Sequence, residues 1–339
     1  MKRFAIGLVV GKFAPLHRGH ESVIRAAIEA CDHVVILSYS RPEFPGCEPE
    51  RRATWLATLF PTTTRIVLDH AGTPLPANDD PADIHRAFCA SVLREKTNSP
   101  VDAIFTSEDY GPGFAADLAR RQGSPAEHVA VDLGRVQVPV SGTELRRDIH
   151  GLRHFLSPEV YAGFVKRVAL VGGESTGKST LAAALAEHFG TTYVAEYGRE
   201  LWEELDGVLK YDDLLKIARE QIRREETALR DPATHRFVFC DSTPLTTLFY
   251  SHEMFGRADP ELEQLAARTY DHTFLCAADF PFVQDGTRRG ESFREIGQEW
   301  YLLNHPKGRI GILRGNVEER VCYASSLLTP QILRREMAP

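Results

Sequence analysis

The chain has 339 residues, a formal net charge of −7, and a composition of 43% hydrophobic and 26% charged residues. These values are typical of a soluble globular protein, and the length favours two domains. The negative charge and the lack of a long basic run argue against a nucleic-acid partner held through its phosphates. The six cysteines are spread along the chain without a C-x-x-C pair, which favours free thiols in a reducing cytoplasm.

The apolar run in the opening segment "MKRFAIGLVVGK" is too short for a signal peptide or a membrane span, and it predicts a first strand. Helical spacing follows in residues 21–30. The pattern then alternates, and a parallel, doubly wound sheet is expected. The further predicted strands are 33–39, 64–70 and 101–107, and the further predicted helices are 49–60 and 81–96.

The alternation pauses at residues 157–166, where Ser157 and Pro158 predict the start of a short helix. It then restarts with a strand at 167–172, a helix at 178–190 and a strand at 236–241. We therefore place a domain boundary near residue 165. The prediction is a Rossmann-like α/β domain at 1–164 followed by a second doubly wound α/β domain at 165–339.

The segment "GKFAPLHRGH", residues 11–20, joins the first predicted strand to its helix. Such a turn places backbone N–H groups and the positive helix end at the carboxyl edge of the sheet, where phosphate binds. Gly11 and Gly19 would let a ligand approach the backbone, while His17, His20 and Lys12 would donate hydrogen bonds. A metal pair is less favoured because no third ligand lies nearby in sequence.

This segment resembles the H-x-G-H signature of nucleotidyltransferases, which transfer an adenylyl or cytidylyl group from a nucleoside triphosphate. "VSGTELR", residues 140–146, resembles their second marker, I-S-S-T-x-x-R, with Val140 and Gly142 as departures. The resemblance implies in-line attack on ATP, with charge at the α-phosphate stabilised by Lys12, His17, His20 and Arg146. The ATP-binding residues it implies are Gly11, Phe13, His17, His20, Ser141, Thr143 and Arg146.

Two further segments resemble nicotinamide mononucleotide adenylyltransferases of the NadR type. In "FTSEDYG", residues 105–111, the resemblance makes Ser107, Glu108 and Tyr110 candidate substrate contacts. In "ERRATWL", residues 50–56, it does the same for Arg52 and Trp55, although a core position fits Trp55 equally well.

The second half contains G-x-x-x-x-G-K-S at residues 172–179, between a predicted strand and a predicted helix, the context of a P-loop. Lys178 should reach the β- and γ-phosphates and Ser179 should bind Mg²⁺. Asp241 ends a predicted strand, where it would be a second metal ligand or a catalytic base. The predicted ATP-binding loop comprises Gly172, Gly173, Glu174, Ser175, Thr176, Gly177, Lys178, Ser179 and Thr180.

"VQDGTRRGESFR", residues 283–294, carries Arg288, Arg289 and Arg294 in a polar stretch suited to a lid over ATP. "VAEYGRE", residues 194–200, and "QDGTRR", residues 284–289, resemble the ribosylnicotinamide kinase domain of NadR proteins. That resemblance makes Glu196, Tyr197 and Arg199 candidate riboside contacts. Whether Glu196 or Asp241 is the kinase base stays open.

Taken together, these resemblances imply a bifunctional enzyme of NAD salvage in the cytoplasm. With ATP and Mg²⁺, it would convert nicotinamide riboside to nicotinamide mononucleotide and then to NAD. Some NadR proteins carry a helix-turn-helix, which is not expected here because the sequence opens on a strand. A homo-oligomer is compatible with the sequence. The alternatives are a fused phosphopantetheine adenylyltransferase and dephospho-CoA kinase, or a nucleotide-sensing regulator with one inactive domain.

Overall fold

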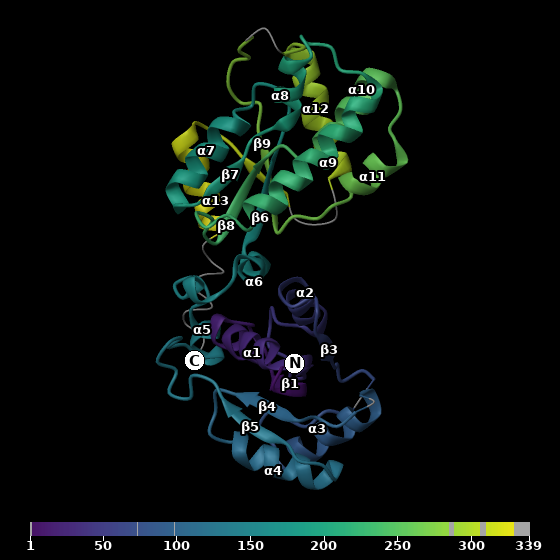
Figure 1. The fold of residues 1–339 in the computed structure, drawn as a ribbon. Coiled ribbons are helices and arrows are strands. Elements are labelled where there is room, and N and C mark those ends of the chain that lie inside the picture. Colours follow the sequence, from purple (N-terminus) through teal and green to yellow (C-terminus); the bar gives the residue numbers. More distant parts are fainter. Residues whose placement is uncertain (1, 73, 98, 285–287, 306–309, 329–339) are drawn as a thin grey trace. The chain divides into compact units, whose positions relative to one another are not determined.

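The computed structural model describes residues 2–72, 74–97, 99–284, 288–305 and 310–328 (Figure 1). The chain divides into two compact units, the first being Met1–Phe164 and the second starting at Val165. Each unit is built on a five-stranded parallel sheet. The predicted fold class, two doubly wound α/β units, is confirmed. None of the helices in the described part of the chain is long and apolar enough to cross a membrane.

The sheet of the first unit has the strand order β3-β2-β1-β4-β5. The order reverses at β1, which pairs with β2 on one side and with β4 on the other, so a ligand crevice is expected at its carboxyl end. The strands are β1 Phe4–Gly11, β2 Cys31–Ser38, β3 Thr64–Val67, β4 Ala103–Thr106 and β5 Glu127–Ala130. The helices are α1 Arg18–Ala30, α2 Pro49–Leu59, α3 Ala82–Lys96, α4 Gly111–Gln122, α5 Gly142–Arg147 and α6 Pro158–Tyr161, with 3₁₀ turns η1 Arg153–Phe155 and η2 Ala162–Phe164.

The central strands β1, β2 and β4 carry apolar, mostly buried runs, as expected where helices cover both faces of a parallel sheet. Leu8, Val35 and Ile104 from three neighbouring strands form one buried cluster with Leu93 of α3 and Leu118 of α4. Burial of such side chains stabilises each by about 1.5–3 kcal/mol relative to exposure. The rigid sheet thus fixes the loops that leave its carboxyl edge.

The second unit has the strand order β10-β9-β6-β8-β7. Its first strand, β6, pairs directly with β8, so the loop after β6 and the residue that ends β8 lie at the same edge. The strands are β6 Lys166–Val171, β7 Thr192–Val194, β8 Phe237–Asp241, β9 His272–Cys276 and β10 Ile310–Leu313. The helices are α7 Lys178–Phe189, α8 Tyr197–Glu204, α9 Tyr211–Ala228, α10 Pro244–Phe255, α11 Pro260–Ala266, α12 Glu291–Asn304 and α13 Val317–Leu328.

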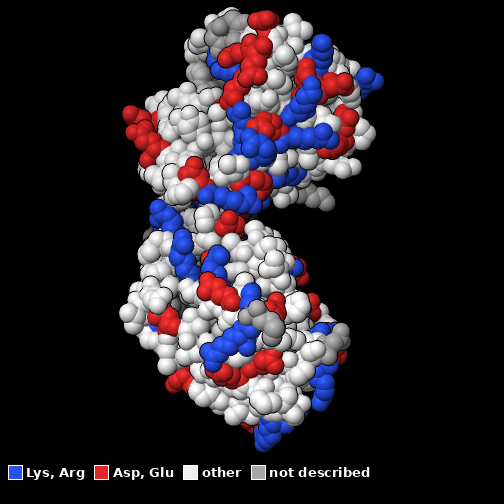
Figure 2. Space-filling view, viewed as in Figure 1, with Lys and Arg blue, Asp and Glu red and all other residues white. Residues whose placement is uncertain are grey.

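Charged side chains of both signs alternate over the face of the second unit shown in Figure 2. On α9, Glu220 is paired with both Arg223 and Arg224, and Arg224 also pairs with Glu200 of α8. Basic side chains in this region are therefore matched by acidic neighbours, which weakens their attraction for a polyanion.

Candidate active sites

The H-x-G-H segment forms the start of α1, at the carboxyl end of β1. His17 is the N-cap residue, and its backbone N–H donates to Nδ1 of His20 at 3.4 Å. The two imidazoles stack with their centroids 3.7 Å apart. Gly19 makes room for this arrangement, because a Cβ atom there would lie 3.0 Å from Cε1 of His17. Since Nδ1 of His20 accepts, the neutral ring carries its proton on Nε2.

Both histidines are neutral at pH 7. Burial, with a smaller contribution from the nearby Arg135 guanidinium, lowers the pKa of His17 to about 4. Burial also holds the pKa of His20 well below its usual range, with His17 and Arg135 adding to the effect. The pair can therefore donate hydrogen bonds to phosphate oxygens, but it brings no positive charge.

The second motif lies beside the first. Ser141 caps α5, accepting from the N–H of Glu144 at 3.2 Å. Arg146 donates to Oγ1 of Thr143 at 2.9 Å and to the carbonyl of Ala14 in the H-x-G-H loop. Its guanidinium also stacks over Phe44, 4.0 Å from the ring centroid. Arg146 is thus the physical link between the two motifs.

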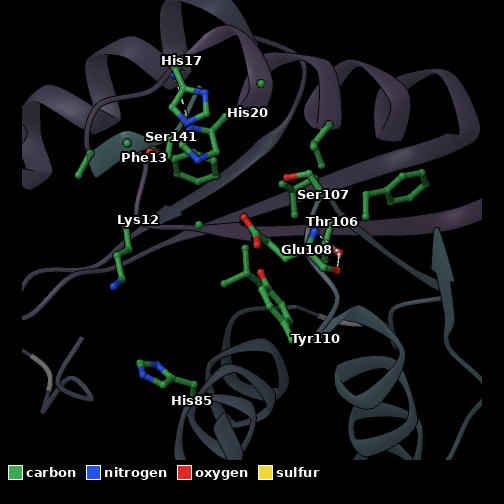
Figure 3. Close-up of a pocket in the computed structure, with 18 of the residues that line it drawn as sticks. Lys12, Phe13, His17, His20, His85, Thr106, Ser107, Glu108, Tyr110 and Ser141 are labelled. Atoms are coloured by element: carbon green, nitrogen blue, oxygen red, sulfur yellow. Dashed lines mark hydrogen bonds between the residues drawn. The ribbon is translucent and has the colours of Figure 1, made fainter. Parts of the chain in front are cut away.

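A cavity of about 580 Å³ opens between these motifs and the segment after β4 (Figure 3). His17 and His20 lie on one side, Tyr110 and His85 lie on the other, and Glu108 projects into the space between them. The sequence-predicted residues that line it are Gly11, Lys12, Phe13, His17, His20, Ser107, Glu108, Tyr110, Ser141, Thr143 and Arg146. Desolvation, followed by the charge of Arg146, lowers the pKa of the Lys12 ammonium.

Two candidate substrate contacts are placed elsewhere. Arg52 is fully buried, ion-paired with Glu43, and donates to the carbonyl of Cys47 at 2.9 Å. Trp55 is 3% exposed and packs against Phe164, with ring centroids 5.8 Å apart. Neither residue lines the cavity. Both therefore act in the packing of α2, the core interpretation left open for Trp55.

Several residues that line the cavity were missed by the sequence analysis, among them Tyr39, His85, Arg86 and Arg135. The hydroxyl of Tyr39 and Nδ1 of His85 are 2.9 Å apart, which fixes the aromatic end of the cavity. Tyr39 ends the apolar run of β2 and could have been found from its position at the carboxyl edge of the sheet. The side chains on α3 and in the 131–140 loop carry no comparable signal.

The second site is the predicted P-loop, between β6 and α7. Gly172 and Gly177 have φ angles of 145° and 77°, which L side chains rarely adopt. At Gly173 a Cβ atom would lie 2.4 Å from the carbonyl oxygen of Arg294, so α12 packs directly on the loop. Nζ of Lys178 donates to the carbonyls of Gly172 and Gly173 at 3.0 and 2.9 Å. The ammonium therefore lies over the phosphate-binding loop.

Two carboxylates lie close enough to Lys178 for its charge to affect their pKa values. Asp241 is 2% exposed, accepts from the Ser179 hydroxyl, and has an Oδ1 atom without a hydrogen-bond partner among the described residues. Glu196 is the N-cap residue of α8 and accepts from the Ser242 side chain. Burial raises the pKa of both carboxyls, and the Lys178 charge opposes this in each case.

A cavity of about 250 Å³ extends from the P-loop. Glu196 and Arg199 line it, as do Arg288 and Arg289, whereas Asp241, Tyr197 and Arg294 do not. Tyr197 instead lies under the guanidinium of Arg224, whose Cζ atom is 4.5 Å from the centroid of the tyrosine ring. All nine predicted loop residues, 172–180, line this cavity.

The arginine-rich segment, residues 283–294, hydrogen-bonds to Glu174 and Ser175 of the P-loop. Arg288 donates to Oγ of Ser175 at 2.8 Å, and the N–H of Arg289 donates to Oε2 of Glu174 at 2.6 Å. Arg294 is 4% exposed and donates to the carbonyl of Phe280 at 2.9 Å. Its guanidinium is therefore buried outside the cavity. Residues 285–287 of the "QDGTRR" segment lie outside the described residues.

A further residue missed by the sequence analysis is Arg320 of α13. It is 2% exposed and donates to the carbonyls of Thr176 at 2.7 Å, Ala277 at 2.9 Å and Gly315 at 2.8 Å. It also pairs with Asp279. The C-terminal helix therefore holds the back of the P-loop.

Within the described residues, no group of three or more His, Cys, Asp or Glu side chains is arranged to hold a metal ion. The oxygen donors of Ser179 and Asp241, with the unpartnered Oδ1, suit Mg²⁺ that arrives with ATP and keeps most of its water and phosphate ligands.

Comparison with known proteins gives three consistent results. A family described as an AAA domain matches residues 167–320. The trifunctional NAD biosynthesis/regulator protein NadR of Escherichia coli (strain K12) is 30% identical over 302 residues, 84% of this chain and 71% of that protein. The protein of the same name from Salmonella typhimurium (strain LT2) gives the same identity and coverage.

Two solved structures share the fold over nearly the whole chain. A crystal structure of a NadR protein in complex with NR has a TM-score of 0.70 at 21% identity, with 97% of each chain covered. A NadR protein in complex with NAD and AMP-PNP has a TM-score of 0.65 at 22% identity, again with 97% of each chain covered.

Proposed function

The chain belongs to the NadR family of NAD biosynthesis proteins, and from this premise we propose that it makes NAD in two ATP-dependent steps. The second unit would phosphorylate nicotinamide riboside, and the first would adenylylate the resulting mononucleotide. The observation that carries the proposal is that two separate cavities are each lined by a predicted phosphate-binding motif together with residues far from that motif in sequence.

In the adenylyl step, a phosphate oxygen of the mononucleotide forms a bond to the α-phosphorus of ATP. The bond from that phosphorus to the bridging oxygen breaks, and pyrophosphate leaves with the electron pair. The nucleophile is already ionised at neutral pH, so the site needs no base, which agrees with two histidines that remain neutral donors. Lys12 and Arg146 would supply the positive charge for the transition state.

In the kinase step, a riboside hydroxyl oxygen forms a bond to the γ-phosphorus of ATP and gives up its proton. The bond from that phosphorus to the β,γ-bridging oxygen breaks, and ADP leaves with the electron pair. Glu196 is the better base, because it lines the cavity while Asp241 does not. Burial raises the pKa of Glu196, which strengthens it as a proton acceptor. Asp241, bonded to Ser179, would orient the metal that neutralises the phosphates. Lys178 would stabilise the charge that develops on the transferred group.

The test is a product assay of the purified protein with ATP, Mg²⁺ and nicotinamide riboside, followed by chromatography. We expect both the mononucleotide and NAD. Mononucleotide alone would contradict the proposed activity of the first unit and would favour a sensor role for its cavity. If neither product forms, the proposal is wrong, and phosphopantetheine and dephospho-CoA are the next substrates to assay.

A further inference from the structure

The adenylyltransferase cavity contains a cation that neither motif supplies. Arg135 lies in the loop between β5 and α5, lines the cavity, and is close enough to His17 and His20 to lower the pKa of both rings. Because those rings are neutral, the charge balance of the site depends on its lysine and arginine side chains. Arg135 lines the same cavity as Lys12 and Arg146 and adds a third cation to it.

The loop is built to hold this arginine in an unusual conformation. Arg135 has φ = 50° and Asp132 has φ = 49°, both in the left-handed region that costs non-glycine residues energy. The Asp132 carboxylate offsets that cost by accepting backbone N–H groups from Val136 at 2.8 Å and Val138 at 3.1 Å. The N–H of Arg135 itself donates to the Asp132 carbonyl at 2.8 Å. Backbone strain that is maintained by several hydrogen bonds is common at functional sites, where it fixes the direction of a side chain.

The partner of Arg135 is Glu108, in the segment after β4. The two side chains are 41% and 44% exposed, so their ion pair faces the cavity rather than the core. Exposed ion pairs contribute little to stability and exchange readily for other partners. The backbone of Glu108 is held separately, because Thr106 donates to its carbonyl at 2.9 Å. The carboxylate can therefore release the guanidinium without a change in the loop.

We propose that Arg135 exchanges this partner for the phosphate of the mononucleotide and so positions the nucleophile of the adenylyl transfer. This inference rests on the proposed function. A planar guanidinium can bind two oxygens of a phosphate at once and leave the third free to attack. Its charge also reduces the repulsion between the attacking phosphate and the α-phosphate of ATP. Glu108, released from the pair, then accepts hydrogen bonds from sugar hydroxyls.

The test uses Arg135→Gln and Arg135→Lys in the full chain, with NAD formation measured while the mononucleotide and ATP are varied separately. For Arg135→Gln we expect kcat/KM for the mononucleotide to fall roughly 30- to 100-fold, because a charge-assisted contact is lost. The KM for ATP should change by less than about threefold. Arg135→Lys should restore part of the loss, since it keeps the charge without the fork.

Arg120→Gln is the matched control, because Arg120 also forms an exposed ion pair, with Asp117, but does not line the cavity. It should behave like the wild type. Riboside phosphorylation by the same preparations should be unchanged in every variant. An unchanged KM and kcat for the mononucleotide in Arg135→Gln, or a loss confined to the KM for ATP, would overturn the inference. Failure of the wild type to form NAD would instead overturn the proposed function.

Discussion

The two units carry their predicted phosphate-binding motifs at equivalent places, the turn between the first strand of each sheet and its helix, but they arrange charge in opposite ways. In the first unit the motif presents two neutral hydrogen-bond donors, His17 and His20. In the second unit, the Lys178 charge acts on two carboxyls, Glu196 and Asp241, whose pKa values burial raises. The difference follows the proposed nucleophiles. A phosphate arrives ionised, whereas a hydroxyl has to give up a proton.

The largest effect should come from Lys178→Ala, which removes the P-loop cation. We expect riboside phosphorylation to fall by roughly a thousandfold, because the charge at the transferred phosphate loses its main protein contact. Adenylylation of supplied mononucleotide should persist, since the first unit has its own cations. Lys216→Ala is the control, as that lysine is 66% exposed and paired with Asp213 on α9. Loss of both activities would show that the sites are not separate.

The next effect separates the two carboxylates of the kinase site. Glu196→Gln should lower kcat for riboside phosphorylation by roughly 100- to 1000-fold with little change in the KM for ATP, because a base is lost. Asp241→Asn should instead raise the Mg²⁺ concentration needed for half-maximal rate. Titrations of Mg²⁺ and ATP with both variants test this. The assignment would be reversed if the Mg²⁺ requirement moved with Glu196 and only kcat moved with Asp241.

A smaller loss should follow His20→Ala in the first unit. NAD formation is expected to fall by roughly a hundredfold, the usual cost of removing one donor to a developing charge. Riboside phosphorylation, measured in the same sample, should stay normal. His33→Ala, at an exposed position on β2, is the control. Near-normal NAD formation in His20→Ala would remove the histidine from the proposed mechanism.

The smallest effect is on stability, and its sign should differ between the units. The pKa of His17 is lowered to about 4. The contribution of His17 to the free energy of unfolding is therefore full above about pH 6.5 and is lost as the pH falls toward 4. Glu225, fully buried beside Tyr270 and Arg268, has its pKa raised to about 7 by burial. The contribution of Glu225 to the free energy of unfolding is full below about pH 4.5 and is lost as the pH rises through 7. The contributions of His17 and Glu225 are each at most about 3 kcal/mol.

Hydrogen exchange of amides in β1 and β8 would measure the two units separately at pH 5 and pH 8. Protection of β8 should be greater at pH 5, and that of β1 at pH 8. Glu225→Gln should remove the dependence in β8 and leave the one in β1. If protection in the wild type changed in the same direction in both strands between pH 5 and pH 8, the expected difference between the two units would be wrong.

The parts of the two sites that sequence predicts are those encoded locally. The apolar runs of β1, β2, β4, β6 and β8 fix the sheets, and both phosphate motifs follow directly from strands. Arg320 could not be predicted in this way, because its partner Thr176 is 144 residues distant in the chain. Arg135 was missed because its direction depends on a left-handed backbone, which the sequence signals only through Asp132 three residues before it.

Two predicted arginines make contacts that local sequence does not show. Arg52 was a candidate substrate contact because of a family resemblance, and Arg294 was a candidate ATP contact because it stands in a polar stretch. The structure buries them against Glu43 and the Phe280 carbonyl, and both lie outside the cavities. A buried arginine needs a partner from elsewhere in the fold, and the tertiary neighbour that accepts its hydrogen bonds cannot be read from local sequence.

The hydrogen bond from Arg320 to the P-loop bears on the order in which the two units fold during translation. The first unit is complete at Phe164, so its sheet and cavity can form while the second half is still being synthesised. The P-loop emerges soon afterwards, but its supporting arginine is made 144 residues later. We therefore expect the cavity of the first unit to form first during translation, and the bond from Arg320 to the P-loop to form only when α13 has left the exit tunnel.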